Sequence, residues 1–521
     1  MTLTPVDWAI VALYLAVCLG AGIRMRRYVR NVSDFALAGR EMDVHLGVAS
    51  LAATEIGIVT VMYTGEMGFK SGLAGAAPGI LLCLAMLIVG MTGFVIEPLR
   101  NAGVVTIPEL FEKRFGKKVR WLAGLVVVLG GVLNMGIFLR LGGEFLMYVT
   151  GLDPTAAVSL RLFGQDWHLG VLEITMTFLL ALILTYTVLG GMVSVLITDY
   201  LQFLVKGLGI VIVSVLILWY TNPHELITGL SAVRSESRTA GAMTMTDPFN
   251  PFRSLGYGWV IWQALLAIAV VTTWQTIVAR ALAARDAHTA KRIYRGTAFY
   301  FYGRFGLPGL WGAAAFLYFA SPAAGGLPDG VGSLTAMPVY LGRILPAGIL
   351  GIVIAAMLAA EMSTDSGYLL TWATVIYNDL INPCLRRPMS EEGRLRMIRL
   401  LVLAIGVFLV FYGLWYRIPG RAWDYLAVTG NIYLASLSTL LVGALYWRRA
   451  NSWGALAAIV LGAVGPITFL VFNAIVRDPA RQIPAESAGL SAFAMSFAGM
   501  VFGTLAGRMA RGSAAGPKEV A

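Results

Sequence analysis

The feature that most constrains this chain is a series of apolar runs repeated along all 521 residues. Each run has about 20 residues, enough to cross the hydrocarbon core of a bilayer as a helix. Hydrophobic residues make up 58% of the chain and charged residues only 13%, whereas soluble proteins carry about 25% charged residues. The pattern predicts an all-α polytopic membrane protein whose surroundings are the lipid bilayer, and it argues against a nucleic-acid-binding protein.

The apolar runs divide into about thirteen predicted transmembrane helices. They are expected at residues 8–23, 43–69, 75–99, 120–149, 169–190, 194–220, 255–284, 295–320, 340–381, 397–416, 422–447, 452–476 and 489–509. Lysines and arginines are concentrated in loops that follow odd-numbered spans. Basic loops stay in the cytoplasm, so the N-terminus is expected outside and the C-terminus inside. We expect a multi-pass protein of the plasma membrane, which in a bacterium is the inner membrane.

Residue types that carry common enzyme chemistry are sparse. The three cysteines form no CxxC pair, and the four histidines are scattered without metal-ligand spacing. A zinc or redox enzyme is therefore not expected. We predict that the chain is not an enzyme.

A polar cluster interrupts the apolar run at residues 359–367, AAEMSTDSG. At helical spacing Ala360, Ser363 and Thr364 share one side, while the two acids of the cluster point nearly the other way. Hydroxyl and carbonyl oxygens on a face of small residues suit a hard cation. The alternative is that the hydroxyls bond to their own helix or join two packed helices.

The second span carries a different irregularity. Residues 52–57, AATEIG, place an acid and a glycine in the middle of an apolar run. Such a sequence indicates a helix that unwinds within the membrane, which is tolerated only where the backbone lines a cavity. A broken helix beside a hydroxyl-bearing helix is a common way for secondary transporters to build a cation site.

Several motifs occur in one order along the chain. They are DFALAGR at 34–40, TIPELFEKRF at 106–115, GGMVSV at 190–195 followed by Thr198, Asp199 and Gln202, QTIVARALAA at 275–284, STDS at 363–366 and YND at 377–379. In this order they resemble the sodium/solute symporter family, which includes bacterial sodium-coupled sugar, proline and sialic-acid transporters.

The resemblance implies a LeuT-like core of two inverted five-helix repeats at residues 41–448. An extra helix and a basic cytoplasmic loop would precede it at 1–40. Two additional helices would follow at 449–511, and a short cytoplasmic tail at 512–521.

The resemblance also implies that Na⁺ is the coupling ion, held between the broken helix and the eighth core helix. Its ligands would be the carbonyl oxygens of Ala53, Ile56 and Ala360 and the hydroxyls of Ser363 and Thr364.

Two further residues concern a second cation site or an ion exit path. An acid inside a span is a functional candidate by default, and Asp199 occupies the position that serves this role in some relatives. The alternative is a structural pair between Asp199 and Lys206. Ser366 fits the pattern of a second sodium site, but Gly367 stands where relatives with two sites carry a serine.

The solute site is less constrained. The positions at which sugar-transporting relatives place carboxamides carry few such groups here, so we favour a small organic acid or amino acid over a sugar. Arg140 lies inside a span, and a guanidinium can hold a carboxylate with two hydrogen bonds. The alternative is a self-neutralised pair of Arg140 with Glu144, one turn later. The full hypothesis adds contacts from Glu55, Thr60, Thr273 and Gln275.

The function predicted from these residues is sodium-coupled symport of a small organic solute by alternating access. Two alternatives stay open. One is a proton-coupled symporter that uses Glu55, Asp199, Glu361 or Asp365, and the other is a transporter-like membrane sensor. No obligate protein partner is expected.

Overall fold

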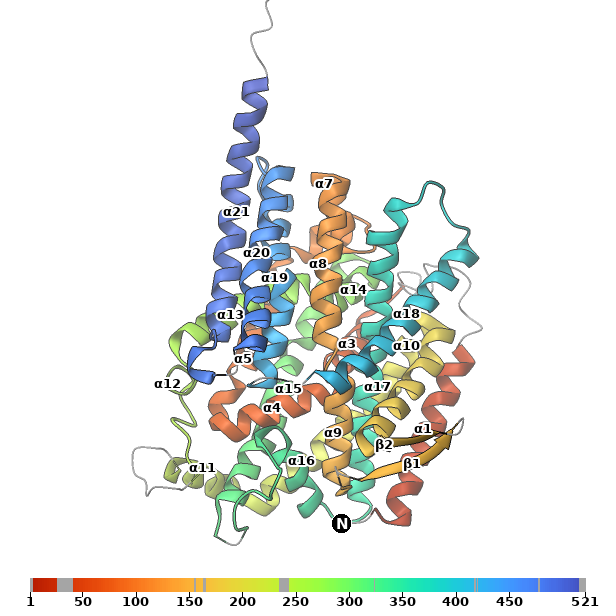
Figure 1. Ribbon diagram of the computed structural model, residues 1–521, viewed down its shortest axis with the longest axis vertical. Coiled ribbons are helices and arrows are strands. Elements are labelled where there is room, and N and C mark those ends of the chain that lie inside the picture. Colours follow the sequence, from red (N-terminus) through yellow and green to blue (C-terminus); the bar gives the residue numbers. More distant parts are fainter. Residues whose placement is uncertain are drawn as a thin grey trace, which may run out of the picture.

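The computed structural model describes residues 3–25, 41–153, 156–162, 165–233, 243–322, 324–416, 418, 420–476 and 478–514 (Figure 1). Most of the predicted basic loop at 24–40, including the motif at 34–40, lies outside these residues, as does most of the predicted tail. Apart from loops and turns, the described residues form helices and a single antiparallel hairpin of β1 (Ala157–Leu162) and β2 (Gln165–Gly170). The prediction of an all-α architecture is confirmed.

The helices of the first half are α1 (Pro5–Met25), α3 (Val44–Thr54), α4 (Ile58–Ser71), η3 (Gly72–Ala76), α5 (Ala77–Thr92), α6 (Ile96–Asn101), α7 (Ile107–Phe115), α8 (Lys117–Met135), α9 (Phe138–Thr150), α10 (Val171–Thr221), α11 (Pro223–Ala232) and α12 (Pro251–Ser254). Those of the second half are α13 (Tyr257–Thr273), α14 (Gln275–Ala283), α15 (Ala287–Ala320), α16 (Ser333–Ile344), α17 (Ile349–Val375), η5 (Ile376–Ile381), η6 (Asn382–Cys384), α18 (Glu391–Trp415), α19 (Ala422–Tyr446), α20 (Ser452–Ile475), η7 (Pro479–Arg481) and α21 (Ala485–Ala514).

Eleven helical stretches among the described residues are long and apolar enough to cross a membrane. This number is two below the thirteen predicted, and the difference arises at two places. α4, η3 and α5 form one continuous stretch, Ile58–Thr92, and α15, which carries Arg304 in its apolar part, is not among the eleven. The chain is a multi-pass α-helical membrane protein.

The long ribbon α10 contains a break that separates two spans. Gly191 has φ 51° and ψ −148°, a backbone conformation that residues with a side chain rarely adopt. The two apolar stretches on either side are Val171–Val188 and Ser194–Thr221. The Gly-Gly motif therefore ends one helix and begins the next, as the predicted spans at 169–190 and 194–220 require.

Among the described helices long enough to cross a membrane, α17 is the most enclosed. All but two of its residues are buried along Ile349–Val375, and it packs against α1, α3, α8, α10 and α18. By contrast, α20 and α21 pack mainly on each other and on α19 at one side of the molecule (Figure 1). The polar cluster of α17 therefore lies in the protein interior, where each of its polar groups faces other helices rather than lipid.

Candidate functional site

The predicted unwinding of the second span is present as a backbone break between α3 and α4. α3 ends at Thr54, Glu55 follows with φ −89° and ψ 0°, and α4 begins after the extended Gly57. A Cβ atom at Gly57 would lie 2.8 Å from the Thr364 hydroxyl oxygen. The absence of a side chain at Gly57 thus lets α17 approach the break closely.

α17 meets this break with the predicted face of small residues. The Thr364 hydroxyl donates to the Thr54 carbonyl oxygen at 2.9 Å, across the two helices. Ala360 is fully buried one turn earlier. The Ser366 hydroxyl instead donates to the Ser363 carbonyl oxygen of its own helix at 3.2 Å. The structure therefore brings the predicted ligand residues of the break and of α17 together, while Ser366 is turned back to its own backbone.

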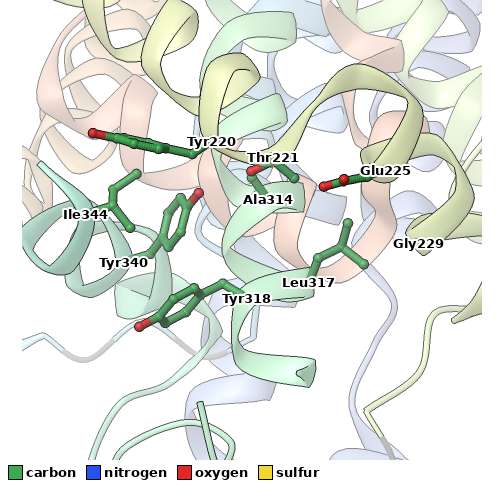
Figure 2. Close-up of a pocket in the computed structure, with 9 residues that line it drawn as sticks. All are labelled: Tyr220, Thr221, Glu225, Gly229, Ala314, Leu317, Tyr318, Tyr340 and Ile344. Carbon is green, nitrogen blue, oxygen red and sulfur yellow. The ribbon is translucent and has the colours of Figure 1, made fainter. Parts of the chain in front are cut away.

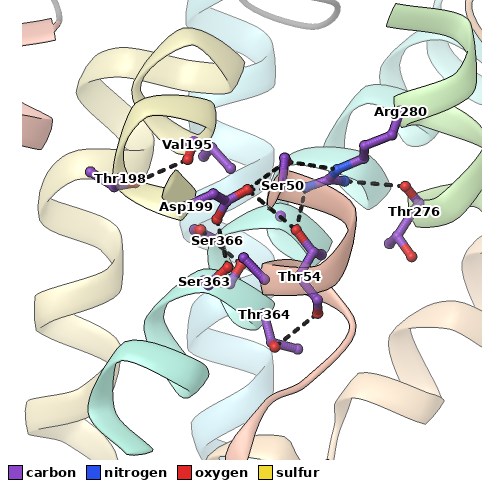
Figure 3. A network of polar contacts seen from close by, with 12 residues as sticks. Ser50, Thr54, Val195, Thr198, Asp199, Thr276, Arg280, Ser363, Thr364 and Ser366 are labelled. Carbon is purple, nitrogen blue, oxygen red and sulfur yellow. Dashed lines mark hydrogen bonds and ion pairs between the residues drawn. The ribbon is translucent and has the colours of Figure 1, made fainter. Parts of the chain in front are cut away.

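Asp199 of α10 is the centre of a buried polar network (Figure 3). Its carboxylate accepts hydrogen bonds from the hydroxyls of Ser50 at 2.7 Å and Ser363 at 2.6 Å, and a longer one from Thr54 at 3.4 Å. The Arg280 guanidinium lies 3.7 Å away, and its side chain is fully buried. One carboxylate thus joins α3, α10, α14 and α17 at the break.

The Lys206 ammonium also lies at the break, a position that was not predicted from the sequence. Its ammonium nitrogen lies 3.2 Å from the carbonyl oxygen of Ala52, 2.7 Å from that of Ala53 and 3.2 Å from that of Ile56. We call these three oxygens the carbonyl cradle. Two of them belong to Ala53 and Ile56, which are predicted to hold sodium. The structural pair of Asp199 with Lys206, considered as an alternative from the sequence, is therefore not formed. Lys206 binds the carbonyl cradle, and Asp199 faces Arg280.

A narrow central cavity adjoins the same break. Its lining comes from α4, α8, α9, α13, α15, α17 and α19, together with the break residue Glu55 and with Trp274, which lies between α13 and α14. The lining residues are Glu55, Val59, Thr60, Tyr63, Asn134, Phe138, Leu266, Val270, Trp274, Arg304, Thr364, Tyr368, Trp423, Leu426, Ala427 and Leu434.

An ion pair lies in the wall of this cavity. The Arg304 guanidinium is 3.1 Å from the Glu55 carboxylate and donates to the Tyr63 hydroxyl at 2.8 Å. Glu55 also accepts a hydrogen bond from the Thr276 hydroxyl at 2.8 Å. Both charged side chains are nearly inaccessible from bulk solvent, so each depends on the other for charge balance.

The sequence profile of the Sodium:solute symporter family matches residues 35–462, which covers the break, the carbonyl cradle and the cavity. The chain belongs to the sodium:solute symporter family. It is therefore a transporter of a family of sodium-coupled solute symporters, and not an enzyme.

Known relatives extend over most of the chain. A sodium/glucose cotransporter of Vibrio parahaemolyticus is 27% identical over 499 residues, covering 90% of this chain and 85% of that protein. The high-affinity proline transporter PutP of Bacillus subtilis (strain 168) is 26% identical over 485 residues, covering 88% of this chain and 91% of that protein.

Two solved structures share the fold. A Na⁺-coupled sialic acid symporter, in its substrate-bound outward-open state, aligns with a TM-score of 0.76 at 19% identity, covering 96% of this chain and 98% of that one. MhsT in complex with L-phenylalanine aligns with a TM-score of 0.51 at 14% identity, covering 89% and 98% of the two chains. The fold of this symporter is LeuT-like, as the resemblance implied.

The structure does not bring Arg140 to the central cavity of the symporter. Its guanidinium is 2.9 Å from the Glu144 carboxylate and donates to the Gly413 carbonyl oxygen at 3.0 Å. The guanidinium is thus held by its own helix and by α18, and Arg140 is not among the residues that line the cavity. Arg304 is the guanidinium of the cavity. Its position inside a span was the available signal, but its pairing with Glu55 could not be read from the sequence.

The remaining predicted solute contacts divide into two groups. Glu55 and Thr60 line the cavity, and the Thr60 hydroxyl lies 3.4 Å from the Glu55 carbonyl oxygen. Thr273 and Gln275 are buried at the junction of α13 and α14 and are outside the lining. The Thr273 hydroxyl donates to its own helix, and the Gln275 side chain accepts a hydrogen bond from the backbone of Ile107.

Glu361 and Asp365 form a separate buried acidic pair on α17. Within the part of the chain that the structure describes, no hydrogen-bond partner reaches any of their four carboxylate oxygens. The Glu361 carboxylate packs against Gly142 of α9, where a Cβ atom would clash with it. The Glu361 carboxylate therefore faces α9, whereas the hydroxyls of Ser363 and Thr364 face α10 and the break.

A wider pocket opens away from these sites, between the ends of α10, α11, α15 and α16 (Figure 2). Tyr318 and Tyr340 lie close together there, and Glu225 lies at the edge formed by α11. None of the residues that line the central cavity contributes to it. This pocket contacts neither the break nor the carbonyl cradle. Although it is wider than the central cavity, we do not assign the solute to it.

Proposed function

We propose that the protein is a sodium-coupled symporter of a small organic solute, an organic acid or amino acid in preference to a sugar, that works by alternating access. The observation that carries this proposal is the Glu55–Arg304 ion pair in the wall of a cavity that shares its backbone break with the carbonyl cradle. The solute would bind in the central cavity and sodium at the break.

The preference for a charged solute rests on how the cavity's polar groups are already bonded. Trp274 donates to the Tyr368 hydroxyl at 2.9 Å, the Trp423 indole donates to Gln263, and the Asn134 amide donates to the Leu426 carbonyl oxygen. A sugar needs many hydrogen-bond partners at once, and few are free here. A solute carboxylate can pair with Arg304, or a solute amino group with Glu55, once the Glu55–Arg304 ion pair separates.

Coupling follows from the shared backbone. Ala53 and Ile56 supply carbonyl oxygens to the carbonyl cradle, and Glu55, which lies between them in the sequence, supplies its side chain to the cavity. A cation that orders this segment also positions Glu55. Sodium and solute should therefore tighten each other's binding by the same factor. A negative-inside membrane potential adds a driving force of about 2.3 kcal/mol per charge per 100 mV.

The detailed organisation belongs to the same proposal. We infer thirteen spans with the N-terminus outside and the C-terminus inside, and a ten-helix inverted-repeat core at residues 41–448. One helix at 1–40 precedes this core, two helices at 449–511 follow it, and the tail at 512–521 is cytoplasmic. The location would be the plasma membrane, the inner membrane in a bacterium. The lysine and arginine bias of the loops supports this orientation.

A proton-coupled symporter is the second candidate, and one observation favours it. Glu361 and Asp365 are buried one turn apart on α17, and their carboxylates have no hydrogen-bond partner among the described residues. Acids in the membrane interior commonly serve proton relays. This reading predicts that a pH gradient drives solute uptake and that a sodium gradient does not.

The test is uptake into proteoliposomes that contain the purified protein. Radiolabelled amino acids, small carboxylates and sugars are offered under an inward sodium gradient, an inward potassium gradient and a pH gradient. The proposal predicts sodium-driven accumulation of an amino acid or carboxylate that Arg304→Met abolishes. The matched control is Arg140→Met, which removes another guanidinium from a span without touching the cavity. Accumulation that needs Arg140 and not Arg304, or that selects a sugar, would contradict the proposal.

A further inference from the structure

The Lys206 ammonium is a fully bonded cation inside the predicted sodium site. A lysine ammonium has three N–H donors and no acceptor, and three carbonyl oxygens surround it at 2.7–3.2 Å. These oxygens are exposed to it only because the helix is broken between α3 and α4. The side chain is fully buried, so the arrangement is an internal feature of the fold and not a surface contact.

The carbonyl cradle offers what a sodium ion also needs. Both cations carry a single positive charge and both are bound by oxygen atoms. The ammonium nitrogen lies 2.7 Å from the Ala53 carbonyl oxygen, so the space directly in front of that oxygen is taken. A second cation cannot share the same oxygens without close contact between two like charges in a poorly screened interior.

From this we propose that the Lys206 ammonium and the coupling sodium ion occupy the carbonyl cradle in turn, so that Lys206 sets the sodium concentration this symporter needs. The inference rests on the proposed function, because it assigns the coupling ion to this site. Lys206 acts here as a specificity-determining residue: it is a cation carried by the chain itself, which the free ion must displace.

The charges around Lys206 support mutual exclusion. The charged groups that face it are Asp199 on its own helix, Glu55 at the break and Arg304 on α15. Both acids already have arginine partners, Arg280 at 3.7 Å from Asp199 and Arg304 at 3.1 Å from Glu55. Three basic side chains therefore share two acidic ones. A sodium ion added beside Lys206 would bring a second cation onto the same three oxygens, whereas a sodium ion that displaces the ammonium toward Asp199 leaves a single cation at the carbonyl cradle.

Asp199 gives the displaced ammonium a place to go. It lies on the same helix, and its carboxylate faces the break through Ser50 and Ser363. A lysine side chain is long and flexible enough to turn along its helix toward such a group. Sodium would then draw on the released carbonyl oxygens together with the hydroxyls of α17.

The effect of Lys206 on sodium affinity can be expressed as an occupancy. The apparent affinity of a ligand equals its intrinsic affinity multiplied by the fraction of protein molecules that are able to bind it. If the ammonium fills the carbonyl cradle in nine molecules out of ten or more, its removal lowers the half-maximal sodium concentration by about tenfold or more. Because all three N–H groups of the ammonium are hydrogen-bonded in the carbonyl cradle, we expect an occupancy of at least nine molecules in ten.

The experiment is thermal unfolding of the full-length protein in detergent, titrated with sodium chloride against potassium chloride at one pH and constant ionic strength. A ligand bound only by the folded state raises the melting temperature by mass action. Native protein and Lys206→Met are compared, because methionine has a similar length and no charge. We expect the half-maximal sodium concentration to fall by about tenfold or more in Lys206→Met.

The control variant is Lys70→Met, which removes the same charge from a lysine that pairs with Glu66 away from the break. It should titrate like the native protein. Lys206→Gln repeats the test if the methionine variant does not fold. Equal half-maximal sodium concentrations in native protein and Lys206→Met, or a sodium response lost with Lys206, would overturn the inference while leaving sodium coupling intact. A complete lack of sodium response in every variant would overturn both the inference and the proposed function.

Discussion

The carbonyl cradle and the central cavity share one backbone break, but they are built from different kinds of atoms. The carbonyl cradle is made of main-chain oxygens of Ala52, Ala53 and Ile56. The cavity is made of side chains from seven helices, with the Glu55–Arg304 pair in its wall. Changes of side chain at Ala53 or Ile56 leave the oxygens in place, whereas changes at the cavity alter the recognition chemistry directly. The cation site should therefore depend on backbone shape, and the solute site on residue identity.

Removal of Arg304 should have the largest effect and would sharpen this contrast. Arg304→Met leaves the Glu55 carboxylate buried without its cation, and breaking a buried ion pair costs about 3–5 kcal/mol. Solute uptake should be lost, and the unfolding free energy in detergent should fall by that amount.

A double variant separates charge balance from recognition. Arg304→Met with Glu55→Gln removes both charges and should recover much of the stability without restoring uptake. If the double variant transported solute like the native protein, the ion pair would be structural and the cavity would need another recognition residue.

The backbone side of the comparison is tested by Gly57→Ala. A Cβ atom at Gly57 would lie 2.8 Å from the Thr364 hydroxyl oxygen and 3.0 Å from the Thr364 Cβ. Such overpacking costs about 1–3 kcal/mol and should push α17 away from the break. The melting temperature should fall, and the sodium response should weaken. Gly207→Ala on α10, where a Cβ atom meets nothing within 4 Å, is the control and should leave both quantities close to native.

The link between α17 and the break can be tested with a smaller change. The Thr364 hydroxyl donates across the helices to the Thr54 carbonyl oxygen, while the Thr371 hydroxyl donates only to its own helix. Thr364→Val should cost about 1 kcal/mol in unfolding free energy and reduce sodium stabilisation. Thr371→Val should change neither by a comparable amount. An equal loss in both variants would show that this hydrogen bond does not position the site.

The smallest effect on transport is expected at Arg140. Its pair with Glu144 is part-buried and its guanidinium also donates to the Gly413 carbonyl oxygen, so Arg140→Met should cost about 1–3 kcal/mol in unfolding free energy. Solute affinity should stay unchanged, because the residue does not line the cavity. A binding assay with the solute found in the uptake screen decides this, and a large loss of affinity would return Arg140 to the solute site.

Local patterns in the sequence were sufficient to predict the features that local backbone chemistry determines. The polar AATEIG stretch indicated the break, the two apolar runs at 169–190 and 194–220 indicated the division of α10, and helical spacing placed Ser363 and Thr364 on one face. The hydropathy of the described helices gives eleven spans instead of the thirteen inferred, for two local reasons. The hydropathy of α15 is lowered by Arg304. In addition, α4 continues through η3 into α5 as one stretch, while α3 is too short to count as a span by itself.

Side-chain pairing across helices could not be predicted in the same way. Arg304 lies 249 positions from Glu55, and Lys206 lies 150 positions from Ile56. Which helices face each other depends on packing of the whole bundle, and no local pattern specifies it. For that reason the guanidinium of the cavity was assigned to Arg140, and Lys206 was considered only as a partner of Asp199.

The most direct test of the account asks whether sodium binds at the break and α17. Lys206→Met protein is melted in sodium and in potassium, with and without the further changes Ser363→Ala and Thr364→Ala. The account predicts that sodium raises the melting temperature of Lys206→Met and that this rise is absent when both hydroxyls are removed. An equal rise in the two proteins would place sodium elsewhere in the molecule and contradict the account.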